Sequence, residues 1–210
     1  MKSVLNTLEK LKKEPIEKLI NTRMNEFASF KNKSDNEIFN EMCFCFMTAN
    51  FSAHGGIKIQ REIGDGFLHL PQEDLAKRLA ELKHRFPNAR SKFVLEARKY
   101  KDNIKQLLSG FSDDKIARNW LADNVKGLGM KEASHFLRNI GYKNVAIIDF
   151  HIADFLVKNN IIQPLKSRSL TKKKYLEIES ILEEIAKKSS LSLGELDLYL
   201  WYAETGKVLK

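Results

Sequence analysis

The fold of this chain is decided by residues 114–151, DKIARNWLADNVKGLGMKEASHFLRNIGYKNVAIIDFH. Apolar residues at helical spacing predict two amphipathic helices on either side of a short turn that contains Gly127 and Gly129. Gly141 stands where the second helix would end. We therefore predict a helical hairpin over residues 114–140, with backbone amides left bare at the start of its second helix.

Two ionisable residues beside this hairpin are candidates for catalysis. Lys131 lies in the first turn of the second helix, where the macrodipole disfavours a cation and so favours the neutral amine that a nucleophile needs. Asp149 follows the apolar run Val145–Ile148, which we expect to be buried and extended. Each residue has a plainer alternative: Lys131 as one more exposed lysine, and Asp149 as the N-cap of a helix over residues 150–158.

The rest of the chain is also dominated by helical periodicity. Only 10 glycines and 4 prolines occur in 210 residues, which argues against an all-β fold. Ser34 and Ser192 are each followed three residues later by Glu, the pattern of a capping box. A stripe from Leu75 to Phe86 predicts a helix that Pro87 ends. We expect an all-α chain of eight or nine helices.

The charge balance points to an anionic partner. Thirty-six Lys and Arg against 27 Asp and Glu give a net charge of +9, which suits nucleic acid or an acidic membrane surface. The longest apolar run, Met42–Met47, is far shorter than the roughly 20 residues that span a bilayer. The N-terminal residues show no signal-peptide pattern. Charge alone does not choose between these two partners. The absence of a span and of a signal peptide predicts a cytoplasmic protein, and we expect no membrane partner.

The cysteines and the one basic connector carry less information. Cys43 and Cys45 are too few for a disulfide framework, a zinc site or an iron–sulfur cluster, so we expect two buried thiols in a reducing compartment and no cofactor. The connector Pro164–Lys174 (PLKSRSLTKKK) is interpreted as a solvated loop, with a DNA contact as the alternative.

A resemblance to a known family enters through the hairpin. KGLGMKEASHFLRNIG (residues 126–141) and AIIDFHI (residues 146–152) resemble the helix-hairpin-helix DNA glycosylase superfamily, and in particular its second type of 8-oxoguanine DNA glycosylase/AP lyase. MCFCFMTANFSAHGG, IGDGFLHLP and the final ELDLYLWYAETGKVLK are similar to the same family, so the resemblance covers the whole chain. Relatives with an iron–sulfur cluster are disfavoured because their four C-terminal cysteines are absent.

The resemblance implies a fold and an activity. The fold is an all-α, two-lobe helix-hairpin-helix DNA glycosylase fold, with the hairpin at 114–140, one lobe of about residues 31–125, and the other of residues 1–30 plus 126–210. The implied enzyme is a monomer that flips 8-oxoguanine out of double-stranded DNA. Lys131 attacks the sugar and expels the base, Asp149 stabilises the sugar cation, and the Schiff base decays by β-elimination.

Two other functions stay open at the level of sequence. A non-enzymatic helix-hairpin-helix DNA-binding module would use the same backbone grip on phosphate and would need neither Lys131 nor Asp149. A glycosylase for another oxidised base would keep both residues and differ in its base pocket.

Binding residues are also implied by the resemblance. Backbone amides at Gly127 and Gly129, together with His151, would contact phosphate, and Asn50 would fill the gap that the flipped base leaves. Asn50 has the alternative of a helix C-cap. A monovalent cation would be held by the backbone carbonyls of Asp123, Val125 and Leu128.

The implied base pocket depends on three residues. Trp201 and Phe86 would stack on the flipped purine, and the terminal carboxylate of Lys210 would accept hydrogen bonds from the guanine edge. Core packing is the alternative for both aromatic residues, because each lies on an expected helical stripe.

Overall fold

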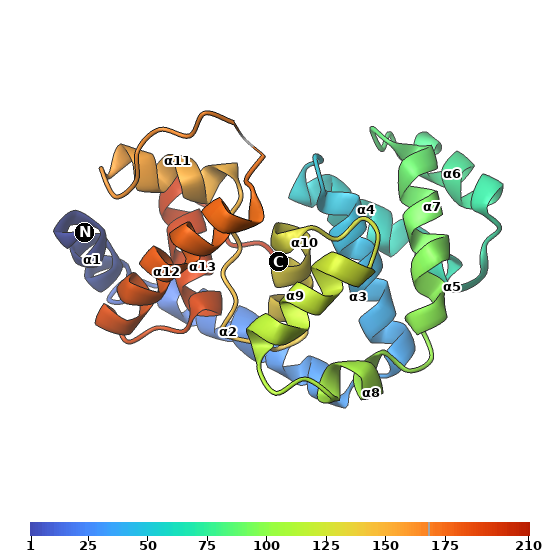
Figure 1. Cartoon of the computed structure of the whole chain (residues 1–210), viewed down its shortest axis with the longest axis horizontal. Helices are drawn as coiled ribbons and strands as arrows, with labels where there is room; N and C mark the ends of the chain where they lie inside the picture. Colours follow the sequence, from blue (N-terminus) through green and yellow to red (C-terminus); the bar gives the residue numbers. More distant parts are fainter. Residues whose placement is uncertain (168) are drawn as a thin grey trace.

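The computed structural model describes residues 1–167 and 169–210; Arg168, in the predicted basic connector, lies outside the described residues (Figure 1). Within these ranges the chain forms thirteen α-helices, two short 3-10 helices (Phe30–Asn32 and Arg98–Tyr100) and no strand. The α-helices are α1 (Lys2–Leu11), α2 (Ile16–Ser29), α3 (Asp35–Thr48), α4 (Ala53–Ile63), α5 (Gly66–His69), α6 (Gln72–Glu81), α7 (Pro87–Ala97), α8 (Ile104–Ser109), α9 (Asp114–Asn124), α10 (Met130–Asn139), α11 (Phe150–Lys158), α12 (Lys172–Lys188) and α13 (Leu193–Thr205).

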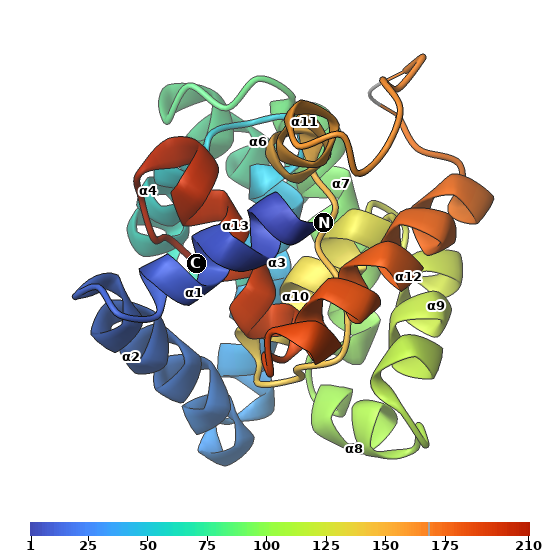
Figure 2. The ribbon, with the colours of Figure 1, turned by 90° about the vertical axis from the view of Figure 1, so that its left-hand side faces the viewer.

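The helices pack around two hydrophobic cores. The first core is built from α3 to α10, and the second from α1, α2, α11, α12 and α13. Figure 2 shows the second group from its outer side, with α13 in contact with α1, α2, α11 and α12. Because other helices contact α13 on several sides, nearly all of its residues from Leu193 to Leu200 are buried rather than a single stripe.

The two cores divide the chain at a different place from the predicted lobes. Val145 is the last residue of the first core, and Ala146 begins the return to the second. The hairpin helix α10 therefore packs with α3 in the first core, although the predicted lobe boundary of 125/126 placed it with the C-terminal helices. The lobe division itself stays a prediction.

Local capping predictions are confirmed, and one helix end is wrong. Ser34 and Ser192 both form complete capping boxes. The helix expected to run from Leu75 to Phe86 ends at Glu81, because Lys83 takes a left-handed φ of 62°. Such a turn usually carries Gly, so the sequence did not show it. Pro87 is the first residue of α7 rather than the end of α6.

The two cysteines are buried thiols, as predicted. Cys43 and Cys45 lie on α3, which is buried on all sides, and burial raises the pKa of both thiols well above the ordinary value. No described helix is long and apolar enough to cross a bilayer. The thirteen described α-helices exceed the eight or nine predicted, and the short helices α5 and α8 contribute to the difference.

Candidate active site

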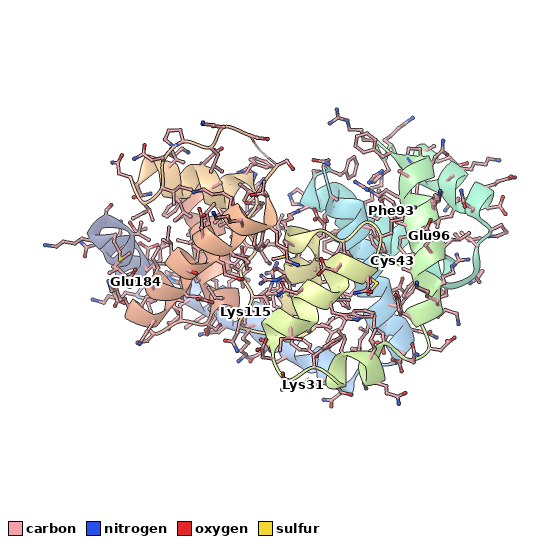
Figure 3. All side chains as sticks on the ribbon, viewed as in Figure 1. Lys31, Cys43, Phe93, Glu96, Lys115 and Glu184 are labelled. Atoms are coloured by element: carbon pink, nitrogen blue, oxygen red, sulfur yellow. The ribbon has the colours of Figure 1, made fainter. Side chains whose placement is uncertain are left out.

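The hairpin turn needs glycine at one of its two glycine positions. Gly127 has a left-handed φ of 97°, and a Cβ atom there would lie 2.4 Å from Cδ2 of Phe93. Phe93 and Glu96 both project from α7, and Glu96 accepts a hydrogen bond from Lys126 of the turn at 3.2 Å (Figure 3). The turn is thus pressed against α7, and a side chain at position 127 would force the two apart.

The start of α10 offers unused backbone donors. Gly129 is the N-cap, with an extended backbone, and no side chain in the described part of the chain caps the first amides of α10. Helix N-termini of this kind attract phosphate. The predicted phosphate-binding amides are therefore placed as the sequence suggested, while phosphate binding itself stays a prediction.

One face of α10 carries three ionisable residues, Lys131, His135 and Arg138, at helical spacing. Lys131 is the second residue of the helix; its side chain is 25% exposed, and its Nζ lies 3.7 Å from Oε1 of Glu132. It is therefore not a freely exposed lysine. Burial holds the pKa of the His135 imidazole well below its ordinary value, helped by the neighbouring Arg138 and Lys131 cations.

The segment before Asp149 is buried, as predicted, and Val145–Ile148 forms no helix. All four residues from Val145 to Ile148 are buried. Side chains of α12 satisfy the backbone hydrogen-bonding groups of this segment. Glu179 accepts the Ala146 N–H at 3.0 Å, and the Tyr175 hydroxyl donates to the Ala146 carbonyl at 2.6 Å. These bonds fix where the segment delivers Asp149.

Asp149 is an N-cap in the structure, which confirms the plainer alternative. One of its oxygens, Oδ1, accepts the Ile152 N–H at 2.9 Å, and α11 begins at Phe150. The cap uses one carboxylate oxygen and the side chain is half-buried, so the other oxygen is available for a second task. A cap also holds the carboxylate in one orientation.

Sequence reasoning missed a second acid, Asp197. It lies buried on α13, with Oδ2 3.7 Å from Nη1 of Arg138. Burial raises the pKa of Asp197 to about 7; the negative charge of Asp149 raises it further, whereas Arg138 and Lys131 oppose the shift. These four residues therefore form one electrostatic group. An acid inside the apolar run LDLYL was the available signal.

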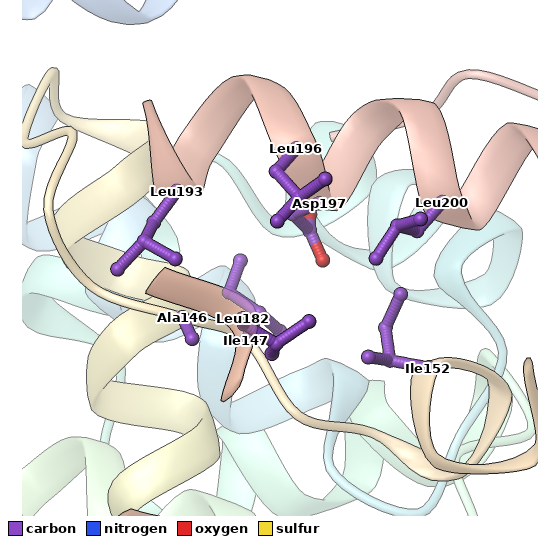
Figure 4. A pocket seen from close by; sticks show the side chains of 8 residues that line it. All are labelled: Ala146, Ile147, Ile152, Leu182, Leu193, Leu196, Asp197 and Leu200. Carbon is purple, nitrogen blue, oxygen red and sulfur yellow. The ribbon is translucent and has the colours of Figure 1, made fainter. Parts of the chain in front are cut away.

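A small cavity lies beside Asp197. It has about 10 Å³ of free volume, room for one water molecule, and Asp197 is its only charged lining residue (Figure 4). The remaining lining residues are apolar: Ala146, Ile147, Ile152, Leu182, Leu193, Leu196 and Leu200. The Asp197 carboxyl thus sits in a largely apolar environment, which explains the direction of its pKa shift.

The structure brings together two residues predicted to bind DNA and base. The rings of His151 and Trp201 meet edge to face, with centroids 5.8 Å apart, and His151 also lies against Phe150 at 3.9 Å. Trp201 is half-buried and packs against the second core, so it is both a core residue and a surface for a ligand.

Phe86 does not pack in either hydrophobic core. It is 39% exposed, and the guanidinium groups of Arg85 and Arg90 lie 5.1 and 5.8 Å from its ring centroid. The core-packing alternative is therefore wrong for Phe86. Its N–H donates to Nδ1 of His84 at 3.0 Å, and this bond holds the residue at the start of α7.

Asn50 and the predicted cation site are placed by backbone geometry. Asn50 follows Ala49, the C-cap of α3, with a left-handed φ of 57°, so its helix-ending role holds to within one residue. Its side chain is exposed, and its DNA contact stays a prediction.

Of the three predicted cation-binding carbonyls, that of Val125 accepts the Leu128 N–H at 3.0 Å and keeps one lone pair. The described residues contain no His, Cys, Asp or Glu cluster that could hold a metal ion.

Comparison with known proteins identifies the family. Residues 20–191 match the sequence profile of the 8-oxoguanine DNA glycosylase family. The chain belongs to this family. An 8-oxoguanine DNA glycosylase/AP lyase of Korarchaeum cryptofilum is 53% identical over 207 residues, covering 99% of this chain and 98% of the relative. One from Thermotoga maritima is 42% identical over the whole of both chains.

Solved structures of the glycosylase family agree. The crystal structure of Methanocaldococcus jannaschii 8-oxoguanine glycosylase/lyase with a 15mer DNA containing 8-oxoguanine has a TM-score of 0.96 and 52% identity, covering 99% of this chain and 100% of that one. The Thermotoga maritima enzyme has a TM-score of 0.92 and 41% identity, covering 100% and 99%. The family resemblance and the all-α helix-hairpin-helix fold are thereby confirmed.

Proposed function

We propose that this chain is a bifunctional DNA repair enzyme that excises 8-oxoguanine from double-stranded DNA and cleaves the abasic site that results. The observation that carries the proposal is the position of Lys131, a mostly buried amine beside the bare amides of α10 and in one electrostatic group with Asp149. Membership of the 8-oxoguanine DNA glycosylase family supports the choice of substrate.

The chemistry follows from these two residues. The neutral Lys131 amine attacks C1′ of the flipped nucleotide, a C–N bond forms, and the bond from C1′ to the base breaks with its electron pair leaving on the base. The proton lost by the amine passes to the departing base or to Asp149. Asp149 also stabilises the positive charge that develops on the sugar. Opening of the sugar gives a Schiff base, and loss of the C2′ proton expels the 3′ phosphate.

The DNA grip is assigned to the residues around this centre. The amides of Gly127 and Gly129 and the side chain of His151 bind backbone phosphate, and Asn50 enters the space that the flipped base leaves. The carbonyls of Asp123, Val125 and Leu128 would hold a monovalent cation, which would supply positive charge for binding phosphate.

The base pocket is assigned to the two aromatic residues and the chain end. Trp201 and Phe86 stack on the purine, while the terminal carboxylate of Lys210 accepts its N1–H and exocyclic amine. The exposure of Phe86 and the partial exposure of Trp201 support these roles. We further propose that the enzyme acts as a monomer in the cytoplasm, where its two buried thiols stay reduced.

Borohydride trapping on a duplex with one 8-oxoguanine tests the proposal. The protein should form a covalent adduct, and Lys131→Gln should form none while binding the duplex with little change. Lys126→Gln, in the same hairpin turn but exposed, is the matched control and should still form the adduct.

Three results would contradict the proposal. An adduct with Lys131→Gln would show that another amine is the nucleophile. Tight binding by the unaltered protein without excision or adduct would indicate a non-enzymatic DNA-binding module. Excision of another oxidised base in preference to 8-oxoguanine would indicate a glycosylase of different specificity.

A further inference from the structure

A buried carboxylate, Glu41 on α3, lies at the junction between the first core and the end of the chain. Glu41 is 2% exposed. Its carboxylate accepts three hydrogen bonds: from Nδ2 of Asn139 at 2.6 Å, from Nε2 of Gln60 at 3.0 Å, and from Nζ of Lys210 at 2.8 Å. The donors come from α10, α4 and the last residue of the chain, so one acid joins three separate segments.

The ammonium group of Lys210 is held from several sides. Besides Glu41, it donates to Oε1 of Gln60 at 2.5 Å, and it lies 4.2 Å from the ring centroid of the fully buried Phe44. A carboxylate, an amide oxygen and an aromatic face are together a complete set of partners for an ammonium ion. The terminal lysine is therefore seated in a formed site and does not extend freely into solvent.

This seat crosses between the two cores. The tail that ends in Lys210 leaves α13, which belongs to the second core, whereas Glu41 and Phe44 belong to α3 in the first. In Figure 1 the chain end lies between the two groups of helices, beside α10. The lysine side chain thus joins the tail, whose Val208 packs against the second core, to α3 of the first core.

The seat adjoins the polar face of α10 that carries Lys131. Asn139, a Glu41 donor, is on this helix. His135 packs edge-on against Phe44, with ring centroids 5.6 Å apart, and it is near enough to both Lys131 and Lys210 for each cation to lower its pKa. The backbone of Lys210 opposes this lowering through a hydrogen-bond contribution, so the last residue lies directly beside His135.

We propose that Glu41 is a positioning residue for base recognition: together with Gln60 and Asn139 it holds the Lys210 ammonium, and so places the terminal carboxylate where the flipped base binds. The inference rests on the proposed function. A buried ion pair contributes little net stability compared with apolar packing, so stability alone does not account for this one. A fixed carboxylate, by contrast, would favour the base whose hydrogen-bond donors match it.

The test compares two reactions of the same protein. Excision of 8-oxoguanine needs the base pocket, whereas cleavage of a preformed abasic site does not. Glu41→Gln keeps the shape of the side chain and removes its charge; Lys210→Met removes the ammonium and leaves the terminal carboxylate. Each variant should lower single-turnover excision about tenfold and reduce abasic-site cleavage much less, because the proposed catalytic residues Lys131 and Asp149 are unchanged.

Two more variants make the test specific. Glu41→Gln and Lys210→Met break the same Glu41–Lys210 ion pair. The double variant Glu41→Gln/Lys210→Met should therefore lose no more excision than either single variant. Lys210→Arg, which keeps a cation, should recover part of the loss. Lys207→Met removes an exposed lysine from the same tail and should excise normally.

Several results would overturn the inference. Equal losses of excision and abasic-site cleavage, tracking a fall in the melting temperature, would mean that Glu41 only supports the fold. If Lys210→Met fails to fold, the double variant, which leaves no unpaired buried charge, gives the comparison. Normal excision by Glu41→Gln would remove it from base recognition. Failure of the unaltered protein to excise 8-oxoguanine would instead contradict the proposed function.

Discussion

Two buried arginine–acid pairs link the hairpin to the C-terminal helices, and they differ in how well they are satisfied. Arg118 on α9 donates from Nη1 and Nη2 to the two oxygens of Glu179 at 2.7 and 2.9 Å, and Glu179 also accepts the Ala146 N–H at 3.0 Å. Arg138 on α10 lies 3.7 Å from Asp197, and its Nε and Nη1 have no hydrogen-bond partner among the described residues.

The difference separates a structural contact from a pair that belongs to the proposed active site. The Arg118–Glu179 pair satisfies both charges and holds the segment before Asp149 in place. The Arg138–Asp197 pair leaves hydrogen bonds unmade, keeps a carboxyl with a pKa of about 7, and lies within electrostatic reach of Lys131 and Asp149. A buried ion pair with missing hydrogen bonds lowers the stability of the fold. Such pairs are retained at sites where a group has to change its charge or its partner.

The largest effect is expected from Asp149, whose negative charge acts on the Arg138–Asp197 pair. Asp149→Asn should slow 8-oxoguanine excision by roughly 10²–10⁴-fold, since it removes the charge that we propose stabilises the sugar cation. Asn is as good an N-cap as Asp, so the melting temperature should change little. Single-turnover kinetics and thermal unfolding measure the two effects. Normal excision together with a collapsed melting temperature would make Asp149 a cap and nothing more.

Glu179→Gln should give the largest loss of stability. Removing one charge of a satisfied buried pair leaves Arg118 without its counter-ion, and we expect a loss of about 3–5 kcal/mol in the free energy of unfolding. Urea denaturation measures it. Excision by the protein that remains folded should fall much less than in Asp149→Asn, because Glu179 only positions the segment that carries Asp149. A loss below about 1 kcal/mol would mean that the Arg118–Glu179 pair is no better satisfied in solution than Arg138–Asp197.

Asp197→Asn should change how stability depends on pH. The folded-state pKa of Asp197 is raised to about 7 from an ordinary 3.8, so its contribution to stability is complete below about pH 4 and is lost as pH rises through 7. Arg138, Lys131 and Asp149 are the charges that act on it. Relative to the unaltered protein, Asp197→Asn should gain about 2 kcal/mol between pH 5 and pH 8.

Denaturant unfolding across that pH range is the measurement. The same comparison with Glu179→Gln serves as the control, and its difference from the unaltered protein should show no such gain near neutral pH. A difference between Asp197→Asn and the unaltered protein that stays constant from pH 5 to pH 8 would show that Asp197 is already ionised in the folded state at pH 5.

The smallest and most direct test replaces each arginine by lysine. Lysine cannot reproduce two parallel hydrogen bonds, so Arg118→Lys should lose about 1–2 kcal/mol of stability. Arg138 makes no such bonds to Asp197, and Arg138→Lys should lose less than about 1 kcal/mol. Chemical denaturation of both variants under one condition gives the comparison. Equal losses would show that the two pairs are alike.

Local features of the fold and site were predictable from sequence. The hairpin, the capping boxes at Ser34 and Ser192, and the position of Lys131 at the start of α10 all depend on residues within a few positions of one another. The end of α6 was not predictable, because Lys83 takes a backbone conformation that usually signals itself through Gly.

The sequence by itself determined an all-α chain, a glycine turn and a lysine and an acid beside it, because periodicity and capping are local interactions. Only the tertiary structure decided that Asp197 meets Arg138, 59 positions earlier, and that Lys210 meets Glu41 across 169 positions. Such pairings depend on how helices distant in sequence are packed, and each buried charge is tolerated only because that packing supplies its partner. The sequence around Asp197 or Lys210 shows only a charged residue next to apolar neighbours. The residue that each charge contacts is decided by the tertiary structure.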